Sequence, residues 1–249
     1  QRALVQWMLN EHVFVNGYKE IAPPYIVNKK TMTGSGNLPK FEDTLFSDKK
    51  NDLWLIPTGE VSLNSMFSDE IISHELPLKY VTHTPCFRDE KSSAGRDTRG
   101  IKRVHQFEKV ELYRFENPSN SLNAFNEMVS EVSKLCEALN LAYRIVELCT
   151  GDIGFQSAKT YDIEVWSAGC KEWLEVSSIS ICTDFQSRRT NTRFRDPIDR
   201  DVKFPHTLNG SGLALPRIII AILENNLLED GTIEIPEVLR EYTRFDSIS

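Results

Sequence analysis

Any fold for this chain has to bury the segment 215–228, which carries apolar residues on nearly every face of a helix. A helix of this kind needs neighbours all round, so we expect it to lie deep behind a sheet. Residues 122–139 repeat apolar side chains every 3.6 positions and predict a helix with one buried face. Residues 1–16 show a similar pattern and predict a third, amphipathic helix that ends at Gly17.

Strand patterns lie between these helices without a regular strand-helix alternation. Runs rich in β-branched and aromatic residues predict strands at 53–56, 80–84, 101–115, 161–165 and 173–181. Mixed polar and turn residues at 31–48 predict a long ordered loop, and small residues at 207–217 predict a turn that leads into the last helix. This order of elements favours an α+β domain built on an antiparallel sheet.

Composition excludes several classes of protein. The 249 residues carry a net charge of −7 and allow one large domain or two small ones. The longest apolar run, 218–223, is far shorter than the roughly 20 residues of a membrane-spanning helix. Five widely spaced cysteines without a CxxC pair argue against a disulfide framework or zinc site and favour the cytoplasm. The common nucleotide-binding, zinc-protease and hydrolase motifs do not occur.

The segment 88–103 concentrates positive charge in an acidic chain. It holds six basic and three acidic residues together with two glycines, Gly95 and Gly100. Arginine side chains suit phosphate oxygens, so the segment fits a polyphosphate or an RNA end. Charge alone, however, favours a solvated hairpin tip.

Two further segments combine polar groups with apolar surroundings. Arg217 lies in the first turn of the predicted last helix, where its charge meets the positive helix end, although a Gly-Ser-Gly turn before a helix is most often only a cap. Glu175 and Ser178 offer oxygen ligands for Mg²⁺. They point to opposite faces of a regular strand, so a shared ion requires a bulge or strong twist. The alternative interpretation, a strand whose polar residues only face solvent, has equal weight.

Taken in order, several strings resemble the catalytic domain of seryl-tRNA synthetase, a class II aminoacyl-tRNA synthetase. A segment around Pro23 and Pro24 comes first. The strings that follow it are GNLPKFED at 36–43, LIPTGE at 55–60, AGRDTRG at 94–100, HQFEKVE at 105–111 and TLNGSGLA at 207–214. The resemblance extends from the first helix to about Tyr242.

The resemblance implies one class II catalytic domain over residues 1–249, with an antiparallel sheet flanked by helices. It implies a homodimer that uses Pro23 and Pro24, and adenylation of L-serine by ATP followed by transfer to tRNA(Ser), and to tRNA(Sec) as well. Members of this family carry an N-terminal coiled-coil arm that grips tRNA. No part of this chain resembles that arm, and because the chain begins within a helix and without Met, we interpret it as a fragment.

The resemblance also assigns the amino-acid site. Thr58, Gly59 and Glu60 correspond to the loop that holds the serine amino group. Glu111 corresponds to the residue that reads the serine hydroxyl, and Ser211 to a further contact with serine. Selectivity against alanine is expected here, because a buried group built to bind a hydroxyl is left unpaired by alanine.

The ATP site follows in the same way. The expected ATP-binding residues are Arg88, Asp89, Glu90, Val104, Phe107, Glu175, Val176, Ser177, Ser178 and Arg217. Arg88 would bind the α-phosphate and the serine carboxylate and is the main catalytic residue. Phe107 and Arg217 would hold the adenine between them, which makes Arg217 the second catalytic assignment. Glu175 and Ser178 are the expected Mg²⁺ ligands.

Some positions depart from the family pattern. Asp89 stands where a small polar residue is commoner and adds negative charge beside Arg88, while Ile179 and Ile181 replace polar residues and either narrow the pocket or simply pack. Two alternative functions remain open. One is a homologue that forms seryl-adenylate but passes serine to an acceptor such as a carrier protein, and the other is a non-catalytic paralogue.

Overall fold

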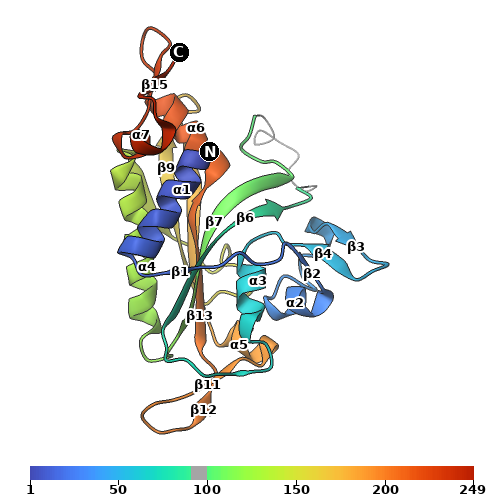
Figure 1. The fold of residues 1–249 in the computed structure, drawn as a ribbon. Helices are drawn as coiled ribbons and strands as arrows, with labels where there is room; N and C mark the ends of the chain where they lie inside the picture. The colour runs from blue at the N-terminus through green and yellow to red at the C-terminus, as the bar shows by residue number, and fades with distance from the viewer. Residues whose placement is uncertain (91–99) are drawn as a thin grey trace.

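The computed structural model describes residues 1–90 and 100–249, and its largest element is a seven-stranded sheet (Figure 1). The strand order is β1-β6-β7-β13-β10-β9-β8, and every neighbouring pair is antiparallel except β1 and β6. The strands are β1 (Lys19–Glu20), β6 (Leu78–Phe87), β7 (Gln106–Glu116), β8 (Tyr143–Glu147), β9 (Lys159–Ser167), β10 (Glu172–Thr183) and β13 (His206–Ala214). The predicted α+β class with an antiparallel sheet is confirmed.

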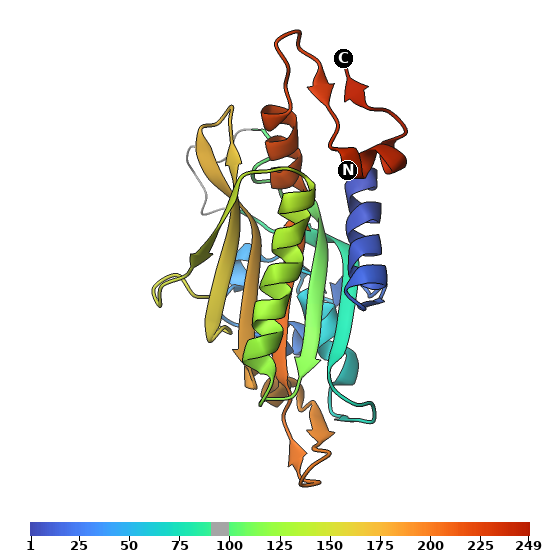
Figure 2. The same cartoon turned by 90° about the vertical axis from the view of Figure 1, so that its left-hand side faces the viewer.

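Long helices cover one face of this sheet. They are α1 (Arg2–Asn10), which continues into the π-helical turn η1 (Glu11–Val15), α4 (Ser121–Ala138) and α6 (Leu215–Asn225). The short helix α7 (Glu237–Thr243) packs against α1. Figure 2 shows α4 lying along the sheet with α1 beside it. Side chains from the helices and this face of the sheet form the largest apolar core, which includes Met8, Phe125, Met128, Ile163 and Ile218. The helices predicted at 1–16 and 122–139 are thus confirmed.

Shorter elements cover the opposite face. The helices there are α2 (Lys29–Gly34), α3 (Glu60–Asn64) and α5 (Phe185–Thr190), with 3-10 turns η2 (Glu42–Thr44) and η3 (Ser65–Phe67). Of the remaining strands, β14 (Ile233–Glu234) and β15 (Ser247–Ile248) pair next to α7 (Figure 1). The others form two small sheets on the side of α2 and α3: β2 (Ile26–Val27) with β4 (Leu53–Leu55) and β3 (Ser47–Asp48), and β5 (Ile71–Ile72) with β11 (Arg193–Arg195) and β12 (Val202–Lys203). Two separate apolar clusters lie on this side.

Strand β7 shows how the two faces of the sheet differ. Val110 and Leu112 belong to the core under α1 and α4, whereas Lys109, Glu111 and Tyr113 point to the opposite face, because successive side chains of a strand alternate. The same alternation runs through β9, β10 and β13. The large sheet therefore offers one apolar face for helix packing and one face with polar groups for a site.

The segment 207–217 departs from its prediction as a turn. Its first eight residues lie in β13, between β7 and β10 in the middle of the sheet. Glycines are required there by close packing: a Cβ on Gly210 would lie 3.0 Å from Ile179 Cγ1, and one on Gly212 would lie 3.0 Å from His12 Nε2. Small residues by themselves predict a turn, but here they let neighbouring side chains pack closely against the strand.

The helix predicted at 215–228 corresponds to α6 and is also shorter and less buried than predicted. It ends at Asn225, so Leu227 and Leu228 lie outside it and are 57% and 49% exposed. Within α6 one face is buried, through Leu215 and Ile218 among others. The sheet covers only that side, because α6 lies at the end of the domain rather than between two layers (Figure 1).

Other boundaries shift by a few residues. The predicted loop at 31–48 contains α2 and η2, and β7 begins at Gln106 rather than at Ile101. The strands predicted at 53–56, 80–84, 161–165 and 173–181 are present as β4, β6, β9 and β10, the last three longer than predicted. Among the described residues, no helix is both long and apolar enough to cross a bilayer.

Candidate active site

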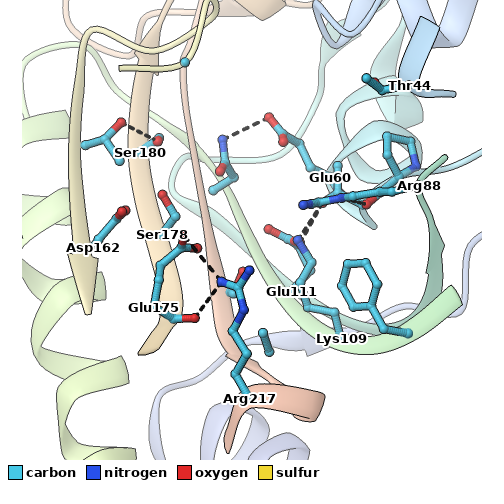
Figure 3. Close-up of a pocket in the computed structure, with 18 of the residues that line it drawn as sticks. Thr44, Glu60, Arg88, Lys109, Glu111, Asp162, Glu175, Ser178, Ser180 and Arg217 are labelled. Atoms are coloured by element: carbon cyan, nitrogen blue, oxygen red, sulfur yellow. Dashed lines mark hydrogen bonds and ion pairs between the residues drawn. The ribbon is translucent and has the colours of Figure 1, made fainter. Parts of the chain in front are cut away.

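The polar face of the sheet lines a cavity of about 670 Å³, a volume typical of small-molecule sites. Strands β7, β9, β10 and β13 supply its sheet wall, the segment before α3 and the end of β6 supply a second side, and the start of α6 closes a third. Figure 3 shows side chains from all of these elements converging on one space.

Thr58, Lys109 and Glu111 form a buried polar cluster in the cavity wall. Thr58 Oγ1 donates to Glu111 Oε2 at 2.7 Å, Lys109 Nζ donates to Thr58 Oγ1 at 2.9 Å, and Lys109 forms an ion pair with Glu111. None of the three residues is more than 7% exposed. A desolvated carboxylate, ammonium and hydroxyl in mutual contact are held in one arrangement and can recognise a small ligand that carries charges and a hydroxyl.

Glu60 adds a second buried carboxylate. Its Oε1 accepts from Asn209 Nδ2 at 2.9 Å and from Gln186 Nε2 at 2.5 Å. Burial, reinforced by the negative charge of Glu111, raises the pKa of Glu60 to about 7, while the hydrogen bond from Gln186 acts in the opposite direction. This carboxylate therefore changes its charge near neutral pH.

Arg88 and Phe107 lie together in the cavity, near the end of β6 and on β7. The Arg88 guanidinium carbon is 5.2 Å from the centre of the Phe107 ring, and Arg88 Nε donates to Pro57 O at 3.3 Å. Close by, Arg103 donates to Glu90 Oε2 at 3.0 Å. A planar cation on an aromatic ring, next to a carboxylate, can bind a phosphate and a flat base.

The facing wall of the cavity is formed by β10 and the start of α6. The pairing of β10 with β9 shifts by one residue between Glu175 and Ser177. This bulge is the irregularity that a shared site for Glu175 and Ser178 requires, and both residues line the cavity. Arg217 Nη1 donates to Glu175 O at 2.8 Å and lies 3.4 Å from Glu175 Oε2. Because Glu175 accepts this cation, the electrostatic cost of an arginine at the helix start is offset.

The donors on this wall fit a magnesium ion carried in by a nucleotide. A carboxylate and a hydroxyl are the hard oxygen ligands that Mg²⁺ prefers, and two protein ligands are usual when phosphates and water supply the rest. No cluster of three or more His, Cys, Asp or Glu residues suited to a metal occurs in the described residues. These residues therefore suit a magnesium ion that protein and nucleotide bind together, and not an ion that the protein binds alone.

Most of the residues expected in the site line the cavity. They are Thr58, Glu60, Arg88, Glu90, Val104, Phe107, Glu111, Glu175, Val176, Ser178, Ser211 and Arg217. Arg88 lies over the Phe107 ring, and Arg217 pairs with Glu175. Phe107 and Arg217 therefore do not contact each other directly, and the expected stacking of adenine between them requires the bound base.

Three expected residues do not line it. Gly59 packs against β6, where a Cβ would lie 2.7 Å from Thr82 Cγ2. Ser177 is buried and donates to Ser211 O at 2.6 Å, and Asp89 uses its backbone N–H to donate to Thr44 O at 3.0 Å. These residues shape the cavity wall from behind.

The departures from the family pattern have a simple outcome at two positions. Ile179 and Ile181 both belong to the apolar core on the helix-covered face and do not line the cavity. They therefore pack and do not narrow the pocket. Within the basic segment 88–103, which fits a polyphosphate or an RNA end but on charge alone a solvated hairpin tip, residues 91–99 lie outside the described residues.

Sequence reasoning missed other lining residues, among them Lys109, Asn209 and Asp162. Lys109 lies between Phe107 and Glu111 on one face of β7, and its alternation with them was a usable signal. Asn209 had no such signal, since the segment at 207–217 was interpreted as a turn. Asp162 lies in the strand predicted at 161–165, where it alternates with the buried Ile163. Burial, with a contribution from the charge of Glu175, raises the pKa of Asp162 to about 6.

Comparison with known proteins agrees with this geometry. Residues 40–226 match the model of the tRNA synthetase class II core domain (G, H, P, S and T). The chain belongs to the class II tRNA synthetase core family. This class II core is similar over its whole length to the serine–tRNA ligase of Dehalococcoides mccartyi strain 195, with 52% identity over 249 residues, and it spans 60% of that relative.

Solved structures give the same result for the class II core. It superposes on seryl-tRNA synthetase from Pyrococcus horikoshii complexed with ATP, with a TM-score of 0.94 and 44% identity over 99% of this chain and 55% of that one. It also superposes on the cytoplasmic serine–tRNA ligase from Naegleria fowleri in complex with AMP, with a TM-score of 0.91 and 32% identity over 99% of this chain and 58% of that one. The predicted class II fold is confirmed.

Proposed function

We propose that this chain activates L-serine with ATP and transfers it to the 3′ end of tRNA(Ser), and to that of tRNA(Sec) as well. The observation that carries the proposal is the buried cluster of Thr58, Lys109 and Glu111 beside Glu60. Such a cluster suits a small zwitterion that bears a hydroxyl. The names of its relatives, and the ATP and AMP bound in its structural neighbours, support the same activity.

Serine would bind with its ammonium group at Glu60 and its hydroxyl at Glu111. Both carboxylates are buried, so an amino acid without a hydroxyl leaves a desolvated oxygen without a donor, which is the costly mismatch. Ser211 lines the same part of the cavity and adds a polar contact. We therefore expect alanine to be rejected strongly, whereas threonine is rejected through the lack of room for its methyl group.

Arg88 would hold the α-phosphate of ATP and the serine carboxylate together. These anions repel one another, and a guanidinium with a rigid fork of donors can bind both. The serine carboxylate oxygen then attacks the α-phosphorus in line as the bond to pyrophosphate breaks, so no side-chain nucleophile is needed. In the second step a terminal ribose hydroxyl of tRNA attacks the seryl carbonyl and AMP leaves.

Glu175 and Ser178 would hold Mg²⁺, which neutralises charge on the phosphates when it is bound. Arg217, which lies 3.4 Å from Glu175 Oε2, would stack on the adenine opposite Phe107. Glu90 and the backbone at Val104 would contact the same base. The ion pair between Arg217 and Glu175 holds both side chains on the cavity wall where the nucleotide would bind.

We also propose a homodimer and a cytoplasmic location. Tyr25 and Ile26, next to the expected interface segment at Pro23 and Pro24, are 41% and 54% exposed and can therefore pack against a second subunit. All five cysteines are free, as expected in a reducing compartment.

The test is serine-dependent exchange of pyrophosphate into ATP with Mg²⁺, because this assay reports the first step without tRNA. We expect exchange with serine, none with alanine, and a loss of roughly 100- to 1000-fold in Arg88→Ala. Arg195→Ala is the matched control, since Arg195 is an exposed arginine on β11 outside the cavity. Exchange that does not depend on serine, or that survives in Arg88→Ala, would contradict the proposal.

A further inference from the structure

Gln186 lies directly behind the amino-acid end of the cavity without lining it. It is the second residue of α5, is fully buried, and donates to Glu60. A buried amide that contacts a cavity carboxylate from behind can control that carboxylate without touching a ligand.

The amide of Gln186 uses every hydrogen bond available to it. Nε2 donates to Ser35 O at 3.1 Å and to Glu60 Oε1 at 2.5 Å. Oε1 accepts from Thr207 Oγ1 at 2.6 Å and shares the single hydroxyl proton of Tyr113 with Asn64 Oδ1, each oxygen lying 2.9 Å from Tyr113 Oη. An amide side chain has two N–H donors and two acceptor positions, so none is left over. A flipped amide would bring its oxygen against two acceptors, and the orientation is therefore fixed.

This arrangement acts on one oxygen of Glu60. Gln186 and Asn209 both donate to Oε1, and no hydrogen bond from a described residue reaches Oε2. Because Glu60 lines the cavity, the carboxylate is anchored through one oxygen while the other remains available to a ligand. The donated hydrogen bond also lowers the pKa of Glu60 against the effect of burial and of Glu111.

We propose that Gln186 is a positioning residue that fixes the Glu60 carboxylate so that its second oxygen accepts the ammonium group of the amino-acid substrate. The inference rests on the proposed function, since it assigns the ammonium group to Glu60. A network that only stabilised the fold would not require its donors to converge on one oxygen of a cavity carboxylate.

Three variants of the natural protein separate positioning from folding. Gln186→Met keeps the volume and removes all four hydrogen bonds, whereas Gln186→Glu keeps the shape and the acceptor oxygens but cannot donate as a carboxylate. Tyr113→Phe is the control, because it removes a hydrogen bond from the acceptor side of the same amide and leaves the bond to Glu60. Each variant is tested by thermal unfolding and by pyrophosphate exchange over a range of serine, ATP and pH.

We expect KM for serine to rise about 10- to 100-fold in both Gln186 variants, with KM for ATP and the Tyr113→Phe values within about twofold of wild type. The pH at which kcat/KM for serine rises should move upward from about 7, because Glu60 loses the donor that favours its charged form. A wild-type enzyme without serine-dependent exchange would refute the proposed function. Normal wild-type exchange with an unchanged serine KM and pH profile in a folded Gln186 variant, or failure of both Gln186 variants to fold, would overturn this inference alone.

Discussion

Lys109 Nζ lies 2.9 Å from Thr58 Oγ1 although the two residues are 51 positions apart, and both contact Glu111. The strand β7 carries two of the three residues and the segment before α3 carries the third. The charge of Glu111 is therefore balanced inside the protein before any ligand arrives.

Lys109→Met is expected to destabilise the protein by about 3–5 kcal/mol, since it leaves Glu111 buried without its cation. The double variant Lys109→Met with Glu111→Gln should recover most of this loss, because no buried charge remains at the pair. Urea unfolding of the two single variants and the double variant forms a double-mutant cycle. Additive losses would show that the two charges do not interact.

Glu60 links stability to pH. Its pKa is about 7 in the folded chain against an ordinary value of 4.5, so between these values the folded state holds a proton that the unfolded state has released. Stability contributed by the protonated form is present below about pH 4.5 and is lost as the pH rises through 7. Glutamine does not ionise, so Glu60→Gln should keep this stability at all pH values. Its free energy of unfolding should therefore rise by up to about 3 kcal/mol relative to that of wild type between pH 4.5 and 8.

The measurement is urea unfolding of wild type and Glu60→Gln at pH 4.5 and pH 8. Glu229→Gln, at an exposed position, serves as the control and should follow wild type. An equal stability difference between wild type and Glu60→Gln at both pH values would show that folding does not raise the pKa of Glu60.

Glu175→Gln tests the metal assignment. An amide is a weaker ligand for Mg²⁺ than a carboxylate, so half-maximal pyrophosphate exchange should require on the order of tenfold more Mg²⁺. Glu164→Gln is the matched control, because Glu164 pairs with Glu175 across β9 and β10 but forms its ion pair with Arg144 at 2.5 Å. The same Mg²⁺ dependence in both variants would remove Glu175 from the metal site.

Gly210→Ala should destabilise the fold by about 1–3 kcal/mol through overpacking. The added methyl group would lie 3.0 Å from Ile179 Cγ1 and 3.3 Å from Met128 Cε, between β13 and α4. Gly151→Ala is the control, since the nearest atom to its Cβ is Cys149 Sγ at 3.9 Å. Thermal unfolding of both variants checks the prediction, and equal melting temperatures would show that α4 can move aside.

The antiparallel α+β class, the helices at 1–16 and 122–139 and most strands could be predicted from the sequence because they depend on local periodicity. An apolar residue every 3.6 positions specifies a helix with one buried face, whatever covers that face. Most of the site was also predictable, although through family resemblance: Arg88, Glu111, Glu175 and Ser178 follow from strings of residues that resemble a known catalytic domain.

Tertiary structure decided the features that depend on contacts between residues far apart in the sequence. Small residues at 207–214 predict a turn, yet they form a central strand, where Gly210 leaves room for Ile179 of β10 and Met128 of α4, and Gly212 leaves room for His12 of η1. Gln186 lies 126 residues from Glu60, and no pattern in the sequence predicts their contact. The sequence by itself determined which faces are apolar and which residues carry charge, whereas packing alone decided which charges meet, because long-range contacts depend on how the two faces of the sheet are covered.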